Sequence, residues 1–272
     1  MKLGITLPSF QDDPEVVLEV ARAAERAELD GVFAFDHLFR EPRGDGTRRP
    51  ALECTTMLGA IAAETERIAF GPLVARATLR PPATLAAALD TLQRVGGDRL
   101  VATLGAGDSQ SEAENVAFGV DLPSEEDRVE RLDQALAATR GRGYPVWVGG
   151  TAFSVRVLAA NRADGWNRWG GTPERFAREA DAVRREVEQA RPAFTVSWAG
   201  LVVAGEDDGA ASAKANRLDP PPGALVGGPE QIAEVLRSYG DAGADWVILG
   251  PIDSPNPDNA SVLGERVRPL LG

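Results

Sequence analysis

Short apolar stretches alternate with longer amphipathic stretches along the whole chain. The short ones, such as residues 31–35, are almost uninterrupted apolar runs, which is typical of strands buried in a parallel sheet. The longer ones open at proline or at a capping Asp, Ser or Thr and carry apolar residues at helical spacing. The predicted strands are residues 2–7, 31–35, 68–74, 100–104, 145–148, 165–169, 194–204 and 246–249. The predicted helices are residues 14–27, 52–65, 82–95, 124–140, 151–160, 172–191, 229–242 and 260–271.

These elements form strand and helix pairs in strict alternation, with no linker or shift in composition between the two halves of the chain. We therefore predict an α/β fold, a single-domain (β/α)8 TIM barrel that spans residues 1–272. The length fits, because such a barrel needs roughly 250 residues. A doubly wound open sheet is the alternative. The first strand is not followed by the GxGxxG motif of that class, which favours the barrel.

Composition narrows the possible partners. The net charge of −12 disfavours nucleic acid and anionic membrane surfaces, because both require a positive surface. The single cysteine, Cys54, has no partner for an internal disulfide, and no signal segment or long apolar span is seen. We expect a soluble, cytoplasmic protein. With one histidine and one cysteine, the sequence predicts no metal site.

The dipeptide Asp36-His37 is the first candidate for chemistry, since it follows the predicted strand at residues 31–35. In a parallel α/β fold the carboxyl ends of the strands form the active-site face. His37 is the only histidine of the chain, and an imidazole titrates near neutrality, which suits an acid or base. The alternative is that His37 has a structural role and that Asp36 caps the next segment.

Glycine-rich segments follow two further predicted strands. One is LGAG at residues 104–107, followed by Asp108, and the other is VGGT at residues 148–151, directly before a predicted helix. Glycines allow a ligand to approach the backbone closely, and a helix start offers amide donors to a phosphate. Ordinary tight turns are the alternative for both. A third segment, GPLVARATLRPP from Gly71, suggests a shaped wall that contains Thr78 and Arg80.

Six blocks of the sequence, in this order, resemble the bacterial luciferase-like monooxygenase family, in particular its branch that uses the deazaflavin coenzyme F420. The blocks are GITLPSF, DGVFAFDHL, AIAAETERIAFG, PATLAAALDTLQRVGGDRLVATLGAG with ENVAFG after it, VWVGGTAFSVRVLAANRADGWN, and VGGPEQIAEVL with AGADWVIL. The resemblance implies a (β/α)8 barrel that binds F420, or alternatively FMN, at its carboxyl face. It also implies a homodimer and a small-molecule substrate.

The resemblance assigns roles to individual residues. It implies that His37 is the catalytic acid or base and that Asp108 is an acidic catalytic residue. It also places a non-proline cis bond between Leu73 and Val74. The cofactor-binding residues that it implies are Asp36, Leu73, Val74, Gly105, Ala106 and Gly107 around the ring and backbone of the cofactor, and Gly149, Gly150 and Thr151 at its phosphate.

The implied function is F420-dependent oxidoreduction, in which a hydride moves between the deazaflavin and a small organic substrate. The alternatives are an FMN-dependent monooxygenase that uses O2 and a non-catalytic protein that binds a flavin or deazaflavin. The sequence departs from the family in being short between residues 140 and 145 and between residues 207 and 226. These segments usually wall the substrate pocket, so an open site or an unusual substrate is expected.

Overall fold

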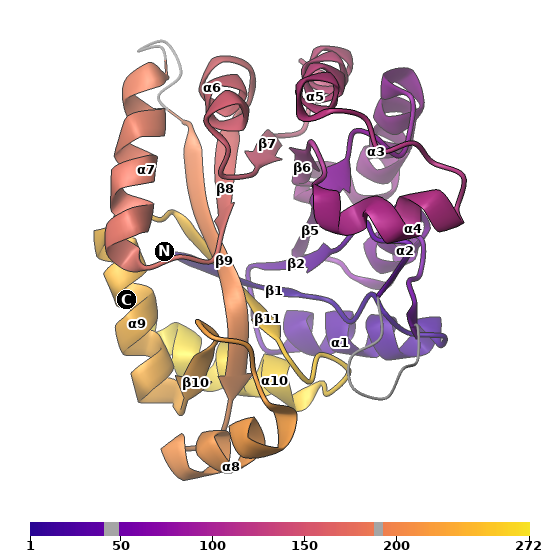
Figure 1. Ribbon diagram of the computed structural model, residues 1–272. Helices are drawn as coiled ribbons and strands as arrows, with labels where there is room; N and C mark the ends of the chain where they lie inside the picture. Colours follow the sequence, from indigo (N-terminus) through magenta and orange to yellow (C-terminus); the bar gives the residue numbers. More distant parts are fainter. Residues whose placement is uncertain (41–48, 188–192) are drawn as a thin grey trace.

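The computed structural model describes residues 1–40, 49–187 and 193–272. Eight parallel strands form a closed barrel in these residues (Figure 1). Neighbours pair in the order β1-β2-β5-β6-β7-β8-β9-β11, and β11 pairs again with β1. The strands are β1 (Lys2–Thr6), β2 (Gly31–Ala34), β5 (Ala69–Arg76), β6 (Ala102–Gly105), β7 (Val146–Gly149), β8 (Gly165–Trp169), β9 (Thr195–Ala204) and β11 (Trp246–Pro251). The closed sheet confirms the predicted barrel and excludes the doubly wound alternative.

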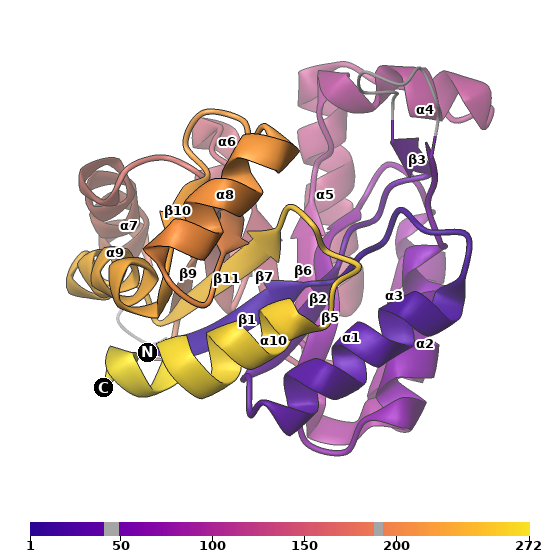
Figure 2. The same cartoon turned by 90° about the horizontal axis from the view of Figure 1, so that it is seen from below.

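Helices cover the outside of the barrel between successive strands. They are α1 (Pro14–Arg26), α2 (Cys54–Glu64), α3 (Pro82–Gly96), α5 (Glu125–Thr139), α6 (Phe153–Arg162), α7 (Pro173–Glu186) and α9 (Pro229–Asp241). The chain ends in a continuous helical stretch made of α10 (Asp258–Ser261), a π-helical turn (Val262–Val267) and a 3₁₀ turn (Arg268–Leu271). Figure 2 shows this stretch beside α1. No helix of the described residues is long and apolar enough to cross a membrane.

The helix starts follow the capping signals of the sequence. The Asp13 carboxylate accepts a hydrogen bond from the amide of Glu15 at 2.9 Å, and Pro14 occupies the first turn. The Ser124 hydroxyl accepts from the amide of Asp127 at 3.2 Å. Thr172 caps α7 in the same way. These side chains satisfy amides that a helix leaves unpaired, which is why the predicted starts are confirmed.

Alternate strand residues face two different apolar clusters. Leu3, Ile5 and Val32 belong to the large cluster that also contains the helix side chains. The second cluster consists of Phe33, Leu73, Val101, Trp147, Ala199, Trp246 and Ile248. Its rings touch edge to face, with the Phe33 and Trp246 centroids 5.9 Å apart. The interior of the barrel is therefore packed with side chains and is not a pore.

Several elements lie outside the predicted pattern. The structure adds a hairpin of β3 (Phe39–Arg40) and β4 (Arg49–Pro50), the short helix α4 (Glu112–Ala117), and α8 (Asp208–Leu218) with β10 (Leu225–Gly227). The strand β10 pairs with β9 as an extra edge strand. Helix α7 ends at Glu186, short of the predicted end at residue 191, and residues 188–192 lie outside the described residues.

Candidate active site at the carboxyl end of the barrel

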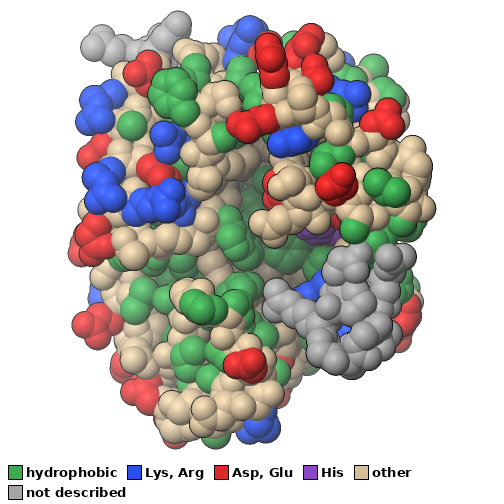
Figure 3. Space-filling view, viewed as in Figure 1, with side chains coloured by type: hydrophobic (Ala, Val, Ile, Leu, Met, Phe, Trp, Pro, Cys, Tyr) green, Lys and Arg blue, Asp and Glu red, His purple; other side chains and the backbone are tan. Residues whose placement is uncertain are grey.

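A cavity of about 730 Å³ lies where β2, β5, β6, β7 and β8 end. Figure 3 shows a hollow lined by apolar side chains with the single histidine at its edge. All the site residues predicted from the sequence line this cavity, so the fold brings four separate segments of the chain together. They are Asp36, His37, Leu73, Val74, Gly105, Ala106, Gly107, Asp108, Gly149, Gly150 and Thr151.

Val74 sits against the glycines that end the next two strands. A Cβ atom added at Gly105 would lie 2.4 Å from Val74 Cγ2, and one added at Gly149 would lie 2.4 Å from Val74 Cγ1. The Leu73–Val74 peptide bond is cis, as the resemblance implied. Both glycines are therefore required by the packing of Val74, and this part of the cavity is built from backbone and one small apolar side chain.

The segment at residues 149–152 leads into α6 without a side-chain cap. Ala152 occupies the N-cap position and makes no side-chain hydrogen bond. Gly150 has a φ of +144°, and its amide donates to the carbonyl of Asn167 at 3.2 Å. Thr151 is exposed and lines the cavity. The first amides of α6 are thus left to water or to an anion at the edge of the cavity.

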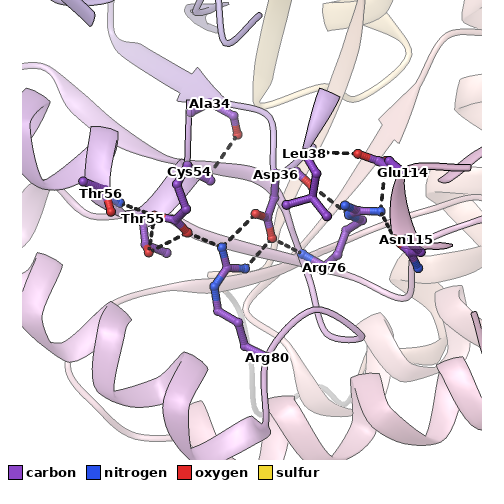
Figure 4. Close-up of polar contacts among 11 residues, drawn as sticks. Ala34, Asp36, Leu38, Cys54, Thr55, Thr56, Arg76, Arg80, Glu114 and Asn115 are labelled. Carbon is purple, nitrogen blue, oxygen red and sulfur yellow. Dashed lines mark hydrogen bonds and ion pairs between the residues drawn. The ribbon is translucent and has the colours of Figure 1, made fainter. Parts of the chain in front are cut away.

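Asp36 is 3% exposed and is held by two arginines (Figure 4). Its carboxylate accepts from Arg80 Nη1 at 2.7 Å, from Arg80 Nη2 at 3.0 Å and from the amide of Arg76 at 2.9 Å. Arg80 also pairs with Glu53, which caps α2. Burial lowers the pKa of Arg80, but its hydrogen bonds with Asp36 and Glu53 raise it overall. The Asp36 carboxylate therefore belongs to a buried ion pair of the cavity wall.

The His37 imidazole extends toward the cavity, with 40% of its side chain exposed. Its Nδ1 lies 2.7 Å from Glu114 Oε1. The ring packs beside two phenylalanines, with centroids 5.7 Å from Phe10 and 6.3 Å from Phe35. Trp169 continues this aromatic side of the cavity, 5.7 Å from Phe35. One ring edge is thus held by a carboxylate while the ring itself borders an apolar, aromatic space.

Glu114, on α4, was not among the predicted site residues. Its side chain is 4% exposed, and its Oε2 accepts from the amide of Leu38 at 2.6 Å. Burial alone raises the pKa of Glu114, but the hydrogen bonds from His37 and Leu38 and the charges of His37 and Arg76 lower it to about 2. The block ENVAFG contains Glu114, but nothing in the sequence pairs it with His37.

Arg76, at the end of β5, links the two carboxylates and is also new relative to the sequence prediction. Its Nε donates to the backbone carbonyl of Asp36 at 2.7 Å, and its Nη1 lies 3.1 Å from both Glu114 Oε1 and Asn115 Oδ1. Burial lowers the pKa of Arg76, while the carboxylates of Glu114 and Asp36 oppose that shift. Nη2 is buried and has no partner among the described residues.

Asp108 is exposed at the edge of the cavity. One of its carboxylate oxygens accepts from the amide of Gln110 at 2.9 Å and caps the 3₁₀ turn Ser109–Ser111. The charge of Asp108 also acts on Arg76. Asp108 therefore lies close enough to the buried charges to share their electrostatic environment, and it keeps a solvent-exposed carboxylate.

Together the geometry combines an imidazole beside aromatic side chains, a wall of glycine backbone, and a helix start that lacks a cap. The imidazole can exchange a proton with a ligand bound over the glycines. The uncapped helix start can hold an anion. The apolar and aromatic side chains that line part of the cavity suit a flat, ring-shaped ligand.

Known proteins resemble this chain in sequence. The sequence profile described as luciferase-like monooxygenase matches residues 1–142. The F420-dependent glucose-6-phosphate dehydrogenase of Beutenbergia cavernae is 34% identical to the chain over 160 residues, which cover 57% of the chain and 46% of that protein. The chain thus matches about half the length of this curated relative.

Solved structures resemble the whole barrel. An F420-dependent secondary alcohol dehydrogenase in complex with an F420-acetone adduct superposes with a TM-score of 0.82 at 15% identity, covering 100% of this chain and 99% of that chain. A riboflavin lyase with modified FMN and the substrate riboflavin superposes with a TM-score of 0.80, also at 15% identity, covering 100% and 91%. At this level of identity the likeness establishes the fold.

Proposed function

The chain belongs to the luciferase-like monooxygenase family, and on that premise we propose that it is an F420-dependent oxidoreductase acting on a small organic substrate. The observation that carries the proposal is that His37 and the backbone of Gly105–Gly107 line one cavity of about 730 Å³. The name of the relative in Beutenbergia cavernae, an F420-dependent dehydrogenase, supports the deazaflavin over a flavin.

The residues present fit a deazaflavin. The cavity volume lies within the range of roughly 300 to 1,000 Å³ that is usual for cofactor sites. Leu73, Val74 and Ala106 offer apolar contact to a flat ring, while Gly105 and Gly107 let the backbone approach it. When bound, F420 supplies the ring carbon, C5, that accepts or donates the hydride.

The phosphate of the cofactor belongs, in this proposal, at the start of α6. Gly149, Gly150 and Thr151 precede this helix, whose first amides lack a side-chain cap. A helix start carries a partial positive charge, which favours an anion. Arg128, from the neighbouring helix α5, also lines the cavity and adds a cation to it.

His37 is proposed as the acid or base, because its imidazole is the partly exposed titratable group beside the aromatic side chains. In the direction of alcohol oxidation it takes the proton of the substrate hydroxyl. Asp108 is proposed as an acidic group at the cofactor edge. Asp36 borders the cofactor and, through Arg80 and Arg76, holds the wall that carries His37.

A second candidate is an FMN-dependent monooxygenase. It is favoured by the family description and by the similarity of the barrel to a riboflavin lyase that holds modified FMN. The resemblance of the sequence to the family also supports a cytoplasmic homodimer. Analytical ultracentrifugation of the purified chain tests the oligomeric state.

The test is a parallel titration of the purified protein with F420 and with FMN, followed by tryptophan fluorescence. Trp169 lines the cavity, and Trp166 donates from Nε1 to the carbonyl of Gly150 at 2.8 Å, so both are expected to respond. A Trp169→Phe variant identifies the local part of the signal. Micromolar binding of F420 with much weaker FMN binding supports the proposal. The reverse preference favours the monooxygenase, and binding of neither overturns both.

Replacement of His37 tests its role once F420 binds. For His37→Ala we expect turnover of F420 with an alcohol panel to fall at least 10²-fold, because the proton acceptor is lost. Folding and F420 affinity stay close to those of the unmodified chain, since the imidazole is partly exposed. Unchanged turnover would remove His37 from the mechanism. F420 binding without turnover by the unmodified chain across the panel would indicate a non-catalytic binding protein.

A further inference from the structure

We propose that Glu114 is a positioning residue for His37. It fixes the imidazole in the tautomer that carries the proton on Nδ1 and so presents Nε2 to the cavity as the proton acceptor. The catalytic part of this inference rests on the proposed role of His37. The tautomer part rests on the geometry of the two side chains alone and can be tested without any cofactor.

The contact between the two side chains determines the tautomer. His37 Nδ1 lies 2.7 Å from Glu114 Oε1, a distance typical of a charge-assisted hydrogen bond. An ionised carboxylate only accepts hydrogen bonds, so Nδ1 must be the donor. In a neutral imidazole the other nitrogen then carries the lone pair. No hydrogen bond to Nε2 is formed within residues 1–40, 49–187 and 193–272.

The Glu114 carboxylate is itself held from two sides. The amide of Leu38, directly after His37 in the chain, donates to Oε2 at 2.6 Å. Arg76 Nη1 lies 3.1 Å from Oε1, the oxygen that His37 shares. Glu114 is 4% exposed and therefore has little freedom to turn away. These contacts keep the carboxylate ionised and its orientation constant. A carboxylate that orients a catalytic or metal-binding imidazole is usually held by hydrogen bonds in this way.

The other charged groups around His37 have contacts or interactions of their own. Asp36, the preceding residue, is bound by Arg80 through two hydrogen bonds. Arg76 is shared between Glu114 and the Asp36 backbone. Arg40 lies over the ring of Phe10, 5.8 Å from its centroid. Asp108 acts on Arg76. Among the described residues, Glu114 is thus the carboxylate in direct contact with the imidazole.

The chain allows an unusually clean measurement. Because His37 is the only histidine, the imidazole nitrogen signals in a ¹⁵N spectrum of the labelled protein belong to it without assignment. At a pH where the ring is neutral, we expect Nδ1 to appear protonated and Nε2 to appear unprotonated. Two averaged signals, or a protonated Nε2, would overturn the proposal in the unmodified protein, before any variant is made.

The matched variants are Glu114→Gln and Glu112→Gln. Glu112 lies on the same helix but is exposed, so its replacement changes the net charge equally without touching His37. We expect Glu114→Gln to give mixed tautomers, because an amide can donate as well as accept, and to lower kcat with F420 at least 10-fold at unchanged F420 affinity. Glu112→Gln leaves both readouts unchanged.

A conservative variant separates positioning from a purely structural role. Glu114→Asp keeps the carboxylate on a shorter side chain, so we expect it to retain the Nδ1-protonated tautomer and to recover part of the kcat lost in Glu114→Gln. Loss of kcat in Glu114→Gln with the tautomer unchanged would overturn the proposal. If the chain binds no F420, the proposed function fails, whereas the tautomer measurement still decides whether Glu114 positions His37.

Discussion

The cavity has two walls of different construction. The first, the histidine wall, consists of Asp36, His37 and Arg76, which line the cavity, and of Arg80 and Glu114, which bind these residues. Its residues are joined by hydrogen bonds and ion pairs between positions that lie 38 to 77 residues apart in the sequence. The second, the glycine wall, consists of Val74, Gly105, Gly149 and Gly150. In this wall the segments can pack closely because the glycines have no side chains, and the backbone itself forms the surface.

This difference decides how each wall fails. Buried charges in the histidine wall have little access to water, so removal of one charge leaves its partner poorly compensated even when the volume of the side chain is unchanged. In the glycine wall a change in charge is irrelevant, whereas one added methyl group meets Val74 at less than a van der Waals distance. Substitutions that change only charge or only volume therefore separate the two walls.

The largest expected effect on stability is that of Asp36→Asn in the histidine wall. The Asp36 carboxylate is 2% exposed and neutralises Arg80, which is itself 16% exposed. Breaking a buried ion pair by removal of one partner costs about 3 to 5 kcal/mol. We expect the free energy of unfolding, measured with urea, to fall by that amount.

The control for this prediction is Glu53→Gln, at the outer end of the same arginine. Glu53 is 43% exposed, and an exposed ion pair contributes less than about 1 kcal/mol. Equal losses in the two variants would mean that burial of the Asp36–Arg80 pair does not matter. Equal stability of Asp36→Asn and the unmodified chain would contradict the assignment of Asp36 to a stabilising ion pair.

The second-largest effect on stability is expected from acidification, which weakens the histidine wall. The pKa of Glu114 is lowered from its usual 4.5 to about 2 in the folded protein. The stabilisation is therefore fully present above pH 4.5, where the unfolded carboxyl is also ionised, and is lost as the pH falls toward 2. It amounts to at most about 3 kcal/mol. The free energy of unfolding of the unmodified chain should fall across this pH range by more than that of Glu114→Gln. An equal dependence on pH in the two proteins would contradict the prediction.

The same contrast explains what the sequence could predict. Strands and helices depend on local periodicity and caps, so the barrel and the helix starts at Pro14 and Thr172 were predictable. The position of His37 in the cavity was predictable because it lies shortly after the end of a strand. The glycine wall was predictable for a similar reason, since each glycine segment ends a strand of its own.

The histidine wall could be predicted only in part. Glu114 lies 77 residues from His37, and their contact depends on the short helix α4, which has too few residues for a periodic signal. Helix α8 was missed for a related reason. Of its residues only Ala211 is buried, so its sequence shows no apolar stripe. Contacts between distant polar residues require the closed barrel, which local patterns do not describe.

The smallest of these effects is expected in the glycine wall, for Gly105→Ala. The new Cβ would lie 2.4 Å from Val74 Cγ2, and overpacking of this kind costs about 1 to 2 kcal/mol and narrows the floor of the cavity. Gly59→Ala is the control, because its nearest neighbour across the new Cβ is Leu92 Cδ2 at 3.8 Å and alanine favours the interior of a helix. We expect that control to be neutral or slightly stabilising.

A second substitution decides whether Val74 causes the loss in Gly105→Ala. Val74→Ala removes the atom that the new Cβ would meet. The loss in free energy of unfolding in the double variant should therefore be smaller than the sum of the two single losses by about 1 kcal/mol. Because no charge changes, the ¹⁵N spectrum of His37 should stay the same in all three proteins. Additive losses would show that the two residues are independent, and an altered imidazole signal would show that the walls are coupled through the barrel.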